Sequence, residues 1–393
     1  MPRSDHHEDG PLATVVVGIE TEYGVVVRGP GGGIDAEANP TNASAALVSS
    51  YVAAVTEAGH GVGRPHRVGW DFGDESPGND ARGEGPNPYA YAPEIETHMV
   101  NAVLTNGSRY YVDHAHPELS TPECRDARSA VVYDRAGERI LVESMRLSEG
   151  LLGDGRSIVV YKNNSDGKGQ SYGCHENYLL SRSLPFSTLV RHATPHLVTR
   201  QIFCGAGKVG SEVPGRRDDR NGFQISQRAD FFEEHVGLET TIKRPIINTR
   251  DEPHADPRRY RRFHVIVGDA NMSELATYLK VGTTALWLSA VQHGFGGDAI
   301  DPTAPVAALR TVSGDLSLAA VLTLADGSSM TALELQWELL SRSRRWLDDG
   351  AGLDNGPRRC TSTWRHDGRR PSRPSNGIRW SSPTESTGWR STG

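Results

Sequence analysis

The spacing of hydrophobic residues along the chain changes between the patterns of strands and of helices. Residues 14–27 carry β-branched runs that are typical of a buried strand, whereas residues 44–58 place apolar side chains at helical spacing up to Gly59. Further apolar runs predict strands over residues 108–118, 157–164, 245–253 and 261–271. The pattern therefore predicts a protein of mixed strands and helices.

Two later segments complete this pattern. Residues 195–205 fit either a strand or a helix. Asn271, with Glu274 three residues later, resembles a capping box and predicts the start of a helix that continues to residue 292. Because strands and helices do not alternate regularly, we expect an α+β fold with an antiparallel sheet rather than a doubly wound parallel sheet.

One long segment lacks any such pattern. Residues 70–92 are polar, rich in Gly and Pro and nearly free of aliphatic side chains. Loops of this length inside a domain are often functional. We therefore predict a mobile, functional loop at 70–92.

The composition excludes several classes of protein. The 393 residues contain 42 Lys+Arg against 49 Asp+Glu, and the resulting net charge of −7 excludes a general nucleic-acid-binding protein. The four cysteines form no CxxC pair, which excludes a zinc ribbon or a disulfide scaffold. With no apolar signal segment or membrane span in the sequence, we expect a soluble cytoplasmic protein with no nucleic-acid or membrane partner and a disordered tail over residues 1–13.

The last part of the chain differs in composition from the rest. Residues 342–393 contain 11 Arg, 5 acidic residues and four of the seven Trp, with few aliphatic residues. This composition fits a basic aromatic arm for nucleic acid, a disordered tail, or GC-rich DNA that is read out of frame. We favour the third interpretation and expect a catalytic domain over residues 14–341, followed by an aberrant, disordered tail.

Candidate chemistry begins in the first strand. Glu20 and Glu22 are two residues apart, so they face the same side of a strand, about 7 Å from each other. Paired carboxylates on an apolar strand are costly unless a cation neutralises them, and Mg²⁺ prefers oxygen ligands. The motif alone fits a magnesium site or a solvated strand face.

The strand at 108–118 strengthens the magnesium interpretation. Arg109, Tyr111 and Asp113 share one face there, and Glu118 follows just past the strand, where we expect Pro117 to end it. A cation, a phenol and carboxylates in a row predict a site for Mg²⁺ and a nucleotide. The nearby pair of His114 and His116 lacks an obvious third zinc ligand, so we interpret both as ordinary polar histidines.

Three downstream segments add polar candidates. Arg228 and Arg250 could hold a phosphate or a carboxylate, and His175 could reach a phosphate or a metal. Each of the three also fits a surface salt-bridge network. The segment GAGKVG at 205–210 resembles half of a phosphate-binding loop, but Val209 stands where Ser or Thr is required, so we reject that interpretation.

Longer segments of the chain closely resemble the Pup ligase/Pup deamidase family, from about residue 14 to residue 340. They are GIETEYG, WDFGDESPGNDARG, LTNGSRYYVDHAHPE, YKNNSDGKGQSYGCHENYLLSR, GFQISQRADFFE, VGLETTIKRPIINTRDEPHADPRRYRRFHVIVGDAN and TYLKVGTTALWL. The family is similar in fold to glutamine synthetases. The resemblance therefore implies a curved antiparallel sheet, backed by helices, that holds ATP and Mg²⁺ as cofactors.

The family has two branches with different activities. Ligases attach the small protein Pup to lysines, whereas the deamidase/depupylase branch converts the C-terminal Gln of Pup to Glu and cleaves Pup from conjugates. The polar segment at 70–92 resembles the loop that marks the depupylase branch, although GIETEYG and SYGCHENY are similar to ligase sequences. We expect a depupylase of the Pup–proteasome pathway, with Pup and pupylated proteins as partners; a Pup–protein ligase or an inactive truncated remnant are the alternatives.

The resemblance also implies roles for individual residues. Asp113 would be the catalytic carboxylate, acting as nucleophile or base, and Arg228 is a weak candidate for substrate binding. The implied ATP-binding residues are Arg109, Thr121, His175 and Arg250. The implied metal ligands are Glu20, Glu22, Tyr111 and Glu118. Family members continue into a small C-terminal domain, which we expect to be lost or frameshifted in this chain.

Overall fold

The structure is a computed structural model. It describes residues 15–57, 79–82, 100–152, 155–212 and 222–349. The predicted tail at 1–13 lies outside these residues, as does the predicted loop at 70–92 apart from residues 79–82. None of the described helices is both long and apolar enough to cross a membrane.

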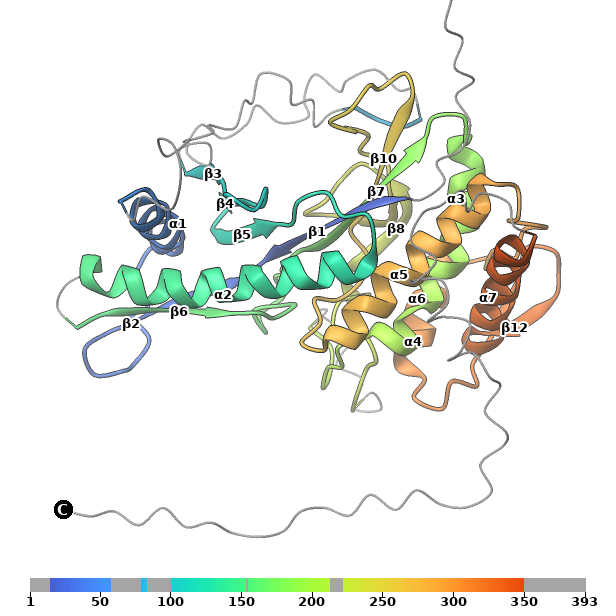
Figure 1. Cartoon of the computed structure of the whole chain (residues 1–393). Helices are drawn as coiled ribbons and strands as arrows, with labels where there is room; N and C mark the ends of the chain where they lie inside the picture. Colours follow the sequence, from blue (N-terminus) through green and yellow to red (C-terminus); the bar gives the residue numbers. More distant parts are fainter. Residues whose placement is uncertain (1–14, 58–78, 83–99, 153–154, 213–221, 350–393) are drawn as a thin grey trace, which may run out of the picture. The chain divides into compact units, whose positions relative to one another are not determined.

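A six-stranded antiparallel sheet forms the centre of the described structure (Figure 1). Its strand order is β10-β7-β1-β5-β4-β3, so strands from both halves of the sequence lie side by side. The strands are β1 (Val16–Glu22), β3 (Asn101–Val103), β4 (Arg109–Asp113), β5 (His116–Ser120), β7 (Cys174–Ser181) and β10 (Tyr260–Val265). Their antiparallel pairing confirms the predicted type of sheet.

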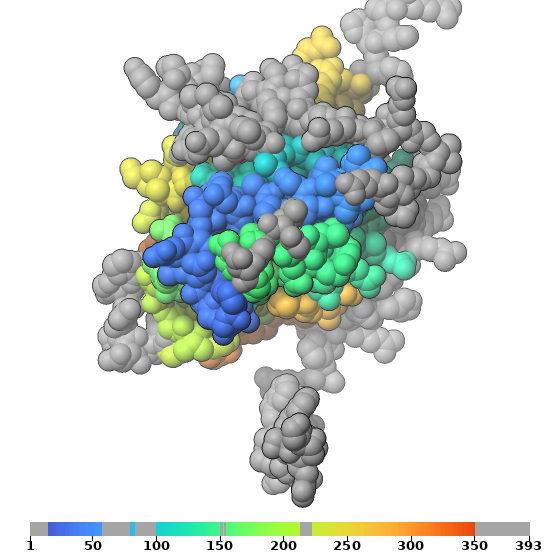
Figure 2. All heavy atoms as spheres, turned by 90° about the vertical axis from the view of Figure 1, so that its left-hand side faces the viewer, coloured from blue at the N-terminus to red at the C-terminus, as the bar shows by residue number. Residues whose placement is uncertain are grey.

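The single strand predicted over 14–27 is two strands in different sheets. Strand β1 ends at Glu22, and β2 (Gly24–Arg28) pairs instead with β6 (Ser157–Tyr161). Gly24 is the first residue of β2, and a side chain there would collide with Tyr172, since a Cβ atom would come within 2.9 Å of its ring. Figure 2 shows these N-terminal elements in blue beside the green segments that include β6, although they are far apart in the sequence.

The strand predicted over 108–118 is also wrong in its extent, because the segment folds as a hairpin. The chain reverses after β4 at His114, which has a φ of 52°, and returns as β5. Pro117 lies inside β5 rather than ending a strand. Proline has no N–H to donate, but the Pro117 carbonyl accepts a hydrogen bond from the Tyr23 backbone N–H, with an N–O distance of 3.1 Å.

The shorter strands form small separate sheets. The parallel pair β8 (Phe232–Gly237) and β9 (Arg244–Asn248) lies beside β10, and β11 (Val321–Thr323) pairs with β12 (Ser329–Thr331). The predicted strand over 245–253 therefore ends at Asn248.

Helices cover one face of the central sheet and continue beyond its β10 edge (Figure 1). They are α1 (Pro40–Glu57), α2 (Ala127–Leu152), α3 (Phe186–Thr199), α4 (Gln201–Cys204), α5 (Glu274–Gln292), α6 (Pro305–Gly314) and α7 (Ala332–Asp348). Val48 of α1 and Leu141 of α2 are buried with Tyr110 and Leu119 of the sheet. Leu47 of α1 is buried in a second cluster, with Val27 of β2 and Ile158 of β6. The ambiguous segment 195–205 is helical in α3 and α4.

The start of α5 differs from the predicted capping box. Ser273 is the N-cap, with its Oγ accepting from the Ala276 backbone N–H at 3.4 Å. Asn271 instead donates from Nδ2 to the Cys204 carbonyl at 2.8 Å. A tertiary contact has replaced the local cap that the sequence spacing suggested.

The C-terminal boundary predicted at residue 341 falls inside α7. Arg342 is buried and donates to the backbone carbonyls of Gly296 and Asp298. Trp346 and Leu347 are buried as well. Composition alone placed these residues in the tail, but they belong to the folded domain. The remaining tail residues, 350–393, lie outside the described residues.

Candidate active site

A cleft of about 910 Å³ lies on the face of the central sheet opposite α2. Strands β1, β4, β5, β7 and β10 contribute to its floor, and the loops around β8 and β9 contribute to its walls. All the predicted site residues line this cleft: Glu20, Glu22, Arg109, Tyr111, Asp113, Glu118, Thr121, His175, Arg228 and Arg250. The structure therefore brings together residues that are up to 230 positions apart in the sequence.

The period of two along each strand explains why these side chains converge. In β1, Glu20 and Glu22 face the cleft, whereas Thr21 between them is buried and donates to Asp134 of α2. In β4, Tyr111 faces the cleft directly opposite Glu118, which is also the pairing partner of Glu22. The predicted common face of Arg109, Tyr111 and Asp113 lines the cleft as expected.

Three carboxylates form a first cluster: Glu22, Asp113 and Glu118 each place an oxygen within 4.8 Å of the others. Burial opposes ionisation of Glu22. Its pKa is nevertheless lowered to about 2, by hydrogen bonds from His116 and the Gly173 backbone N–H and by the charge of His175. Burial and the charges of Asp113, Glu22 and Glu20 raise the pKa of Glu118 well above its usual value. Such a cluster suits a hard cation with oxygen ligands.

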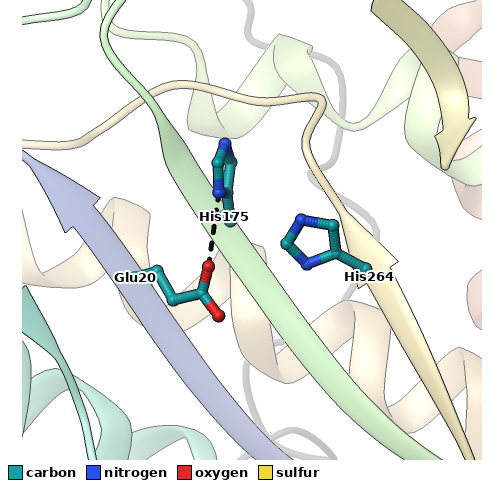
Figure 3. A group of neighbouring side chains, drawn as sticks. All are labelled: Glu20, His175 and His264. Atoms are coloured by element: carbon teal, nitrogen blue, oxygen red, sulfur yellow. Dashed lines mark hydrogen bonds and ion pairs between the residues drawn. The ribbon is translucent and has the colours of Figure 1, made fainter. Parts of the chain in front are cut away.

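A second cluster consists of Glu20, His175 and His264, which come from three neighbouring strands (Figure 3). His175 Nδ1 is 3.3 Å from Glu20 Oε2. Burial, followed by the Arg262 charge, holds the pKa of His264 well below its usual value, so this imidazole is neutral at neutral pH. Its Nε2 is buried without a hydrogen-bond partner in the described structure, which leaves it available to a ligand. Glu20 and Glu22, predicted to serve one metal, therefore belong to two clusters.

The neighbours of Glu20 were missed by the sequence interpretation. Asn177 Nδ2 donates to Glu20 Oε1 at 2.7 Å, and Arg262 Nη2 donates to the same atom at 3.0 Å. Although burial opposes it, the Arg262 charge lowers the pKa of Glu20 well below its usual value. Arg262 and His264 share one face of β10, so the alternation within the predicted strand at 261–271 already contained a signal for both.

Cationic side chains lie around both clusters. Arg109 stacks on the Tyr111 ring, with its guanidinium carbon 4.3 Å from the ring centre. Arg250 has a buried Nε without a hydrogen-bond partner within the described ranges. Arg244, which the sequence interpretation did not select, also lines the cleft, and burial together with the Arg228 charge lowers its pKa to about 10.

The remaining candidates have partners within the protein. Thr121 Oγ1 accepts from the Ile19 backbone N–H at 3.0 Å and lines the cleft. His116 Nδ1 is 3.5 Å from Glu22 Oε2, and His114 Nδ1 is 3.1 Å from Asp113 Oδ2. Neither histidine belongs to a three-ligand cluster in the part of the chain that the structure describes.

This arrangement combines the parts that phosphate and amide chemistry require. Two clusters of possible metal ligands lie next to each other on the sheet, and arginines surround them. The Asp113 side chain, at the end of β4, is 37% exposed. Oxygen-rich clusters can hold divalent cations, and arginines can hold phosphate or carboxylate groups. The partnerless polar atoms of His264 and Arg250 are consistent with a polar ligand in the cleft.

Comparison with known protein families gives one match that spans most of the chain. The model of the Pup-ligase protein family matches residues 15–367. Among curated proteins, the depupylase of Acidothermus cellulolyticus is 52% identical over 86% of this chain and 65% of its own length. The Pup deamidase/depupylase of Mycobacterium tuberculosis is 47% identical over 89% of this chain and 68% of its own length. This chain thus spans about two thirds of the length of these relatives.

Solved structures of a Pup ligase have the same fold. The ligase PafA in its complex with the prokaryotic ubiquitin-like protein Pup matches with a TM-score of 0.65 and 33% identity, over 87% of this chain and 60% of that one. PafA in complex with ADP matches with a TM-score of 0.58 and 42% identity, over 63% of this chain and 54% of that one. These matches confirm the predicted α+β fold of the glutamine-synthetase type.

Proposed function

The chain belongs to the Pup-ligase protein family, and from this premise we propose that it is an amidohydrolase that acts on Pup. In this proposal it converts the C-terminal Gln of Pup to Glu and cleaves the isopeptide bond between Pup and a substrate lysine. It does so in the cytoplasm, in the Pup–proteasome pathway. The higher identity to relatives named depupylase than to those named ligase supports this branch.

The observation that carries the proposal is the position of Asp113. Its carboxylate lies beside Glu22 and Glu118 and is partly exposed to the cleft, where a substrate carbonyl can reach it. A carboxylate in this place can attack an amide carbon or deprotonate a water that attacks it. The C–N bond then breaks, and the nitrogen leaves with a proton as ammonia or as the lysine amine. Where Asp113 itself attacks, water then hydrolyses the acyl–aspartate bond and restores the carboxylate.

The residues of the cleft fit ATP and Mg²⁺ as cofactors. Glu22, Glu118 and Tyr111 would hold one magnesium ion, and Glu20 with His175 and His264 would hold a second cation. Arg109, Thr121 and Arg250 would contact the nucleotide, together with His175. When bound, Mg²⁺ neutralises the carboxylates and stabilises negative charge that develops on oxygen. The cluster of one carboxylate and two imidazoles offers ligand types that divalent cations accept.

Arg228 is the candidate for the α-carboxylate of the terminal Gln or Glu of Pup. Its Nη1 donates to the Ile266 and Gly268 carbonyls, and its Nε donates to Ser171 Oγ at 2.9 Å. Nη2 makes no hydrogen bond with the described residues, and Arg228 lines the cleft. A guanidinium held in this way is preorganised for a carboxylate.

Pup–protein ligase is the alternative, because the matched solved structures are of a ligase. The two activities share the need for Mg·ATP but differ in its fate. A ligase consumes one ATP for each isopeptide bond, whereas the proposed hydrolase releases ammonia from Pup without matching ATP loss. A remnant that lacks catalysis would do neither.

The Asp113→Asn variant tests the proposal. The substitution keeps the size of the side chain but removes the charge that attack or proton abstraction requires, so ammonia release from Pup ending in Gln should fall by at least about 10³-fold. The affinity for Mg·ATP, measured by calorimetry, should change by less than about threefold. Asp298→Asn, at an exposed position outside the cleft, is the matched control.

Two results would contradict the proposal. If the wild-type chain formed Pup–lysine bonds with one ATP consumed per bond and released no ammonia, it would be a ligase. If Asp113→Asn retained wild-type ammonia release, Asp113 would not be the catalytic carboxylate.

A further inference from the structure

The loop between β6 and β7, residues 162–173, forms one wall of the cleft without regular secondary structure. Its tip is a tight turn, in which the Asp166 side chain accepts from the backbone N–H groups of Lys168 and Gln170. Gly169 has a φ of 103°, a conformation that favours glycine. These contacts define the shape of the tip, but they do not attach it to the rest of the protein.

Glu212 supplies that contact from a distant segment of the chain. Its Oε1 accepts from Ser165 Oγ at 2.5 Å, and its Oε2 accepts from the Gly169 backbone N–H at 3.1 Å. One carboxylate thus bridges both sides of the tip. The Glu212 side chain is 14% exposed, so water competes poorly for these hydrogen bonds.

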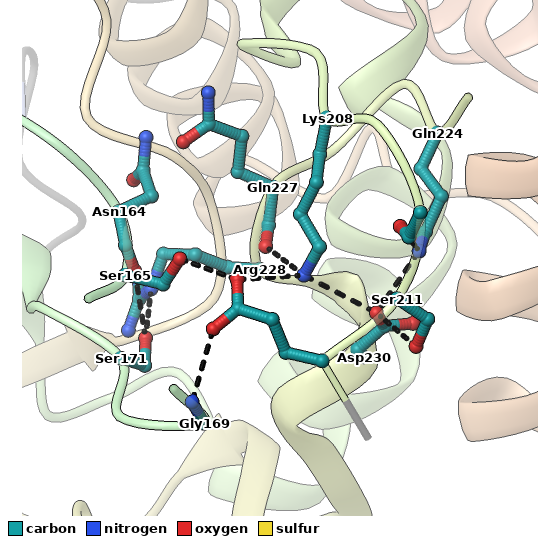
Figure 4. Close-up of polar contacts among 12 residues, drawn as sticks. Asn164, Ser165, Gly169, Ser171, Lys208, Ser211, Gln224, Gln227, Arg228 and Asp230 are labelled. Carbon is teal, nitrogen blue, oxygen red and sulfur yellow. Dashed lines mark hydrogen bonds and ion pairs between the residues drawn. The ribbon is translucent and has the colours of Figure 1, made fainter. Parts of the chain in front are cut away.

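Lys208 connects Glu212 to the segment that carries Arg228. Its Nζ is 3.5 Å from Glu212 and 3.3 Å from Asp230, and it donates to the Gln227 carbonyl at 3.2 Å. The Lys208 side chain is only 8% exposed, so its charge requires these partners. Figure 4 shows these contacts converging on Lys208 between the two segments. The GAGKVG segment, rejected as a phosphate loop, therefore contributes the cation of a structural network.

The other end of the loop contacts two residues of the candidate site. Ser171 Oγ accepts from Arg228 Nε at 2.9 Å, and the Gly173 backbone N–H donates to Glu22 Oε2 at 2.8 Å. A shift of the tip would therefore move hydrogen bonds to the candidate carboxylate-binding arginine and to a candidate metal ligand.

We propose that Glu212 and Lys208 are positioning residues that hold the 162–173 loop against Arg228 and Glu22, and thereby set the affinity for the terminal carboxylate of the substrate. The consequence for the substrate rests on the proposed function, whereas the anchoring of the loop does not. Neither residue lines the cleft among the described residues, so both act through the loop.

The test compares the purified full chain with its Glu212→Gln variant. Only one of the two terminal atoms of an amide can accept a hydrogen bond, so the variant keeps at most one of the bonds from Ser165 and Gly169, and its neutral side chain forms no ion pair with Lys208. Backbone hydrogen exchange in the peptide covering 164–173 should therefore accelerate by about fivefold or more. With Pup ending in Gln as substrate, KM for ammonia release should rise by about fivefold or more, while kcat stays within about twofold. Lys208→Met should change both quantities in the same direction.

Two further variants complete the design. Ser165→Ala removes one of the two donors and should give a smaller effect, which keeps the test usable if Glu212→Gln folds poorly. Glu233→Gln, at an exposed position on β8, is the matched control and should leave exchange and KM unchanged.

Unchanged exchange in the loop of Glu212→Gln and Ser165→Ala would overturn the anchoring. A loosened loop with wild-type KM, or a loss confined to kcat, would overturn the link to substrate binding. If the wild-type chain released no ammonia, the proposed function would fail, but the exchange measurement would still decide whether Glu212 and Lys208 hold the loop.

Discussion

The pKa values of two neighbouring carboxylates in the cleft, Glu22 and Glu118, shift in opposite directions because their hydrogen-bond partners and nearby charges differ. Glu22 accepts from the Gly173 backbone, which approaches so closely that a Cβ atom at residue 173 would lie 2.5 Å from Glu22 Oε1. Glu118 is 2% exposed and faces the charges of Asp113 and Glu22. Without a cation, the folded state therefore favours protonation of Glu118 but ionisation of Glu22.

Glu118→Gln should stabilise the metal-free chain. Because the folded pKa of Glu118 is raised, the folded state binds more protons than the unfolded state, and stability falls as the pH rises above the unfolded pKa of about 4.3. Removing this carboxyl should raise the free energy of unfolding at pH 7 by on the order of 0.5–2 kcal/mol, a gain that disappears near pH 4. Thermal unfolding with and without Mg²⁺ measures this, and the rise in Tm caused by Mg²⁺ should shrink.

Exposed Glu37→Gln is the control, with no expected change in Tm or in its response to Mg²⁺. A lower Tm for Glu118→Gln, with an unchanged response to Mg²⁺, would show that this carboxylate is structural.

At the scale of elements, helix α7 shows how burial extends the domain past the boundary suggested by composition. The helix begins with a capping box between Thr331 and Glu334, a purely local signal. Its packed side includes Leu335 and Leu339, and the helix contacts α3 and α5. Gln336 also donates to Thr199 Oγ1 at 2.7 Å, which joins α7 to the end of α3. Arg342, Trp346 and Leu347 in its C-terminal part are buried as well, so packing keeps this arginine-containing segment in the helix.

Leu339→Ala measures the contribution of α7 to the folded domain. The side chain is 2% exposed, so its removal leaves a cavity and should lower the free energy of unfolding by about 2–5 kcal/mol. Leu333→Ala, on the same helix but 43% exposed, should change it by less than about 1 kcal/mol. Urea unfolding of both variants decides the point, and equal effects would mean that α7 does not pack as described.

At the scale of the whole described structure, a buried ion pair joins the sheet to the helices that lie beyond it. Arg200, at the end of α3, donates through two nitrogens to Glu176 of β7, at 2.8 and 2.7 Å. It also donates to the Val267 carbonyl and to Thr284 Oγ1 of α5. Burial opposes ionisation of Glu176, but the Arg200 charge lowers its pKa below the usual value. Strand and helices thus share one network of charges and hydrogen bonds.

Glu176→Gln should be strongly destabilising, because it leaves the buried Arg200 charge without its counter-ion. The expected loss is about 3–5 kcal/mol in the free energy of unfolding. Glu143→Gln breaks the exposed pair with Arg146 on α2 and should lower the free energy of unfolding far less, because water screens this pair. Chemical unfolding of the two variants provides the comparison, and similar losses would argue against a special role for the buried pair.

The sequence by itself determined the local features of this protein. Period-two alternation predicted that Glu20 shares a face with Glu22, and that Arg109, Tyr111 and Asp113 share another, because alternation depends only on a residue's own strand. The structure shows that both faces line the cleft. Tertiary structure decided which strands became neighbours. It separated Glu20 from Glu22 by pairing Glu20 with His175 and Glu22 with Glu118, and it added Asn177, Arg262 and His264. Local patterns do not encode the order of the strands, because it depends on contacts between segments far apart in the chain. For the same reason they do not encode the hydrogen bonds from Asn271 and Arg342 to distant backbone carbonyls.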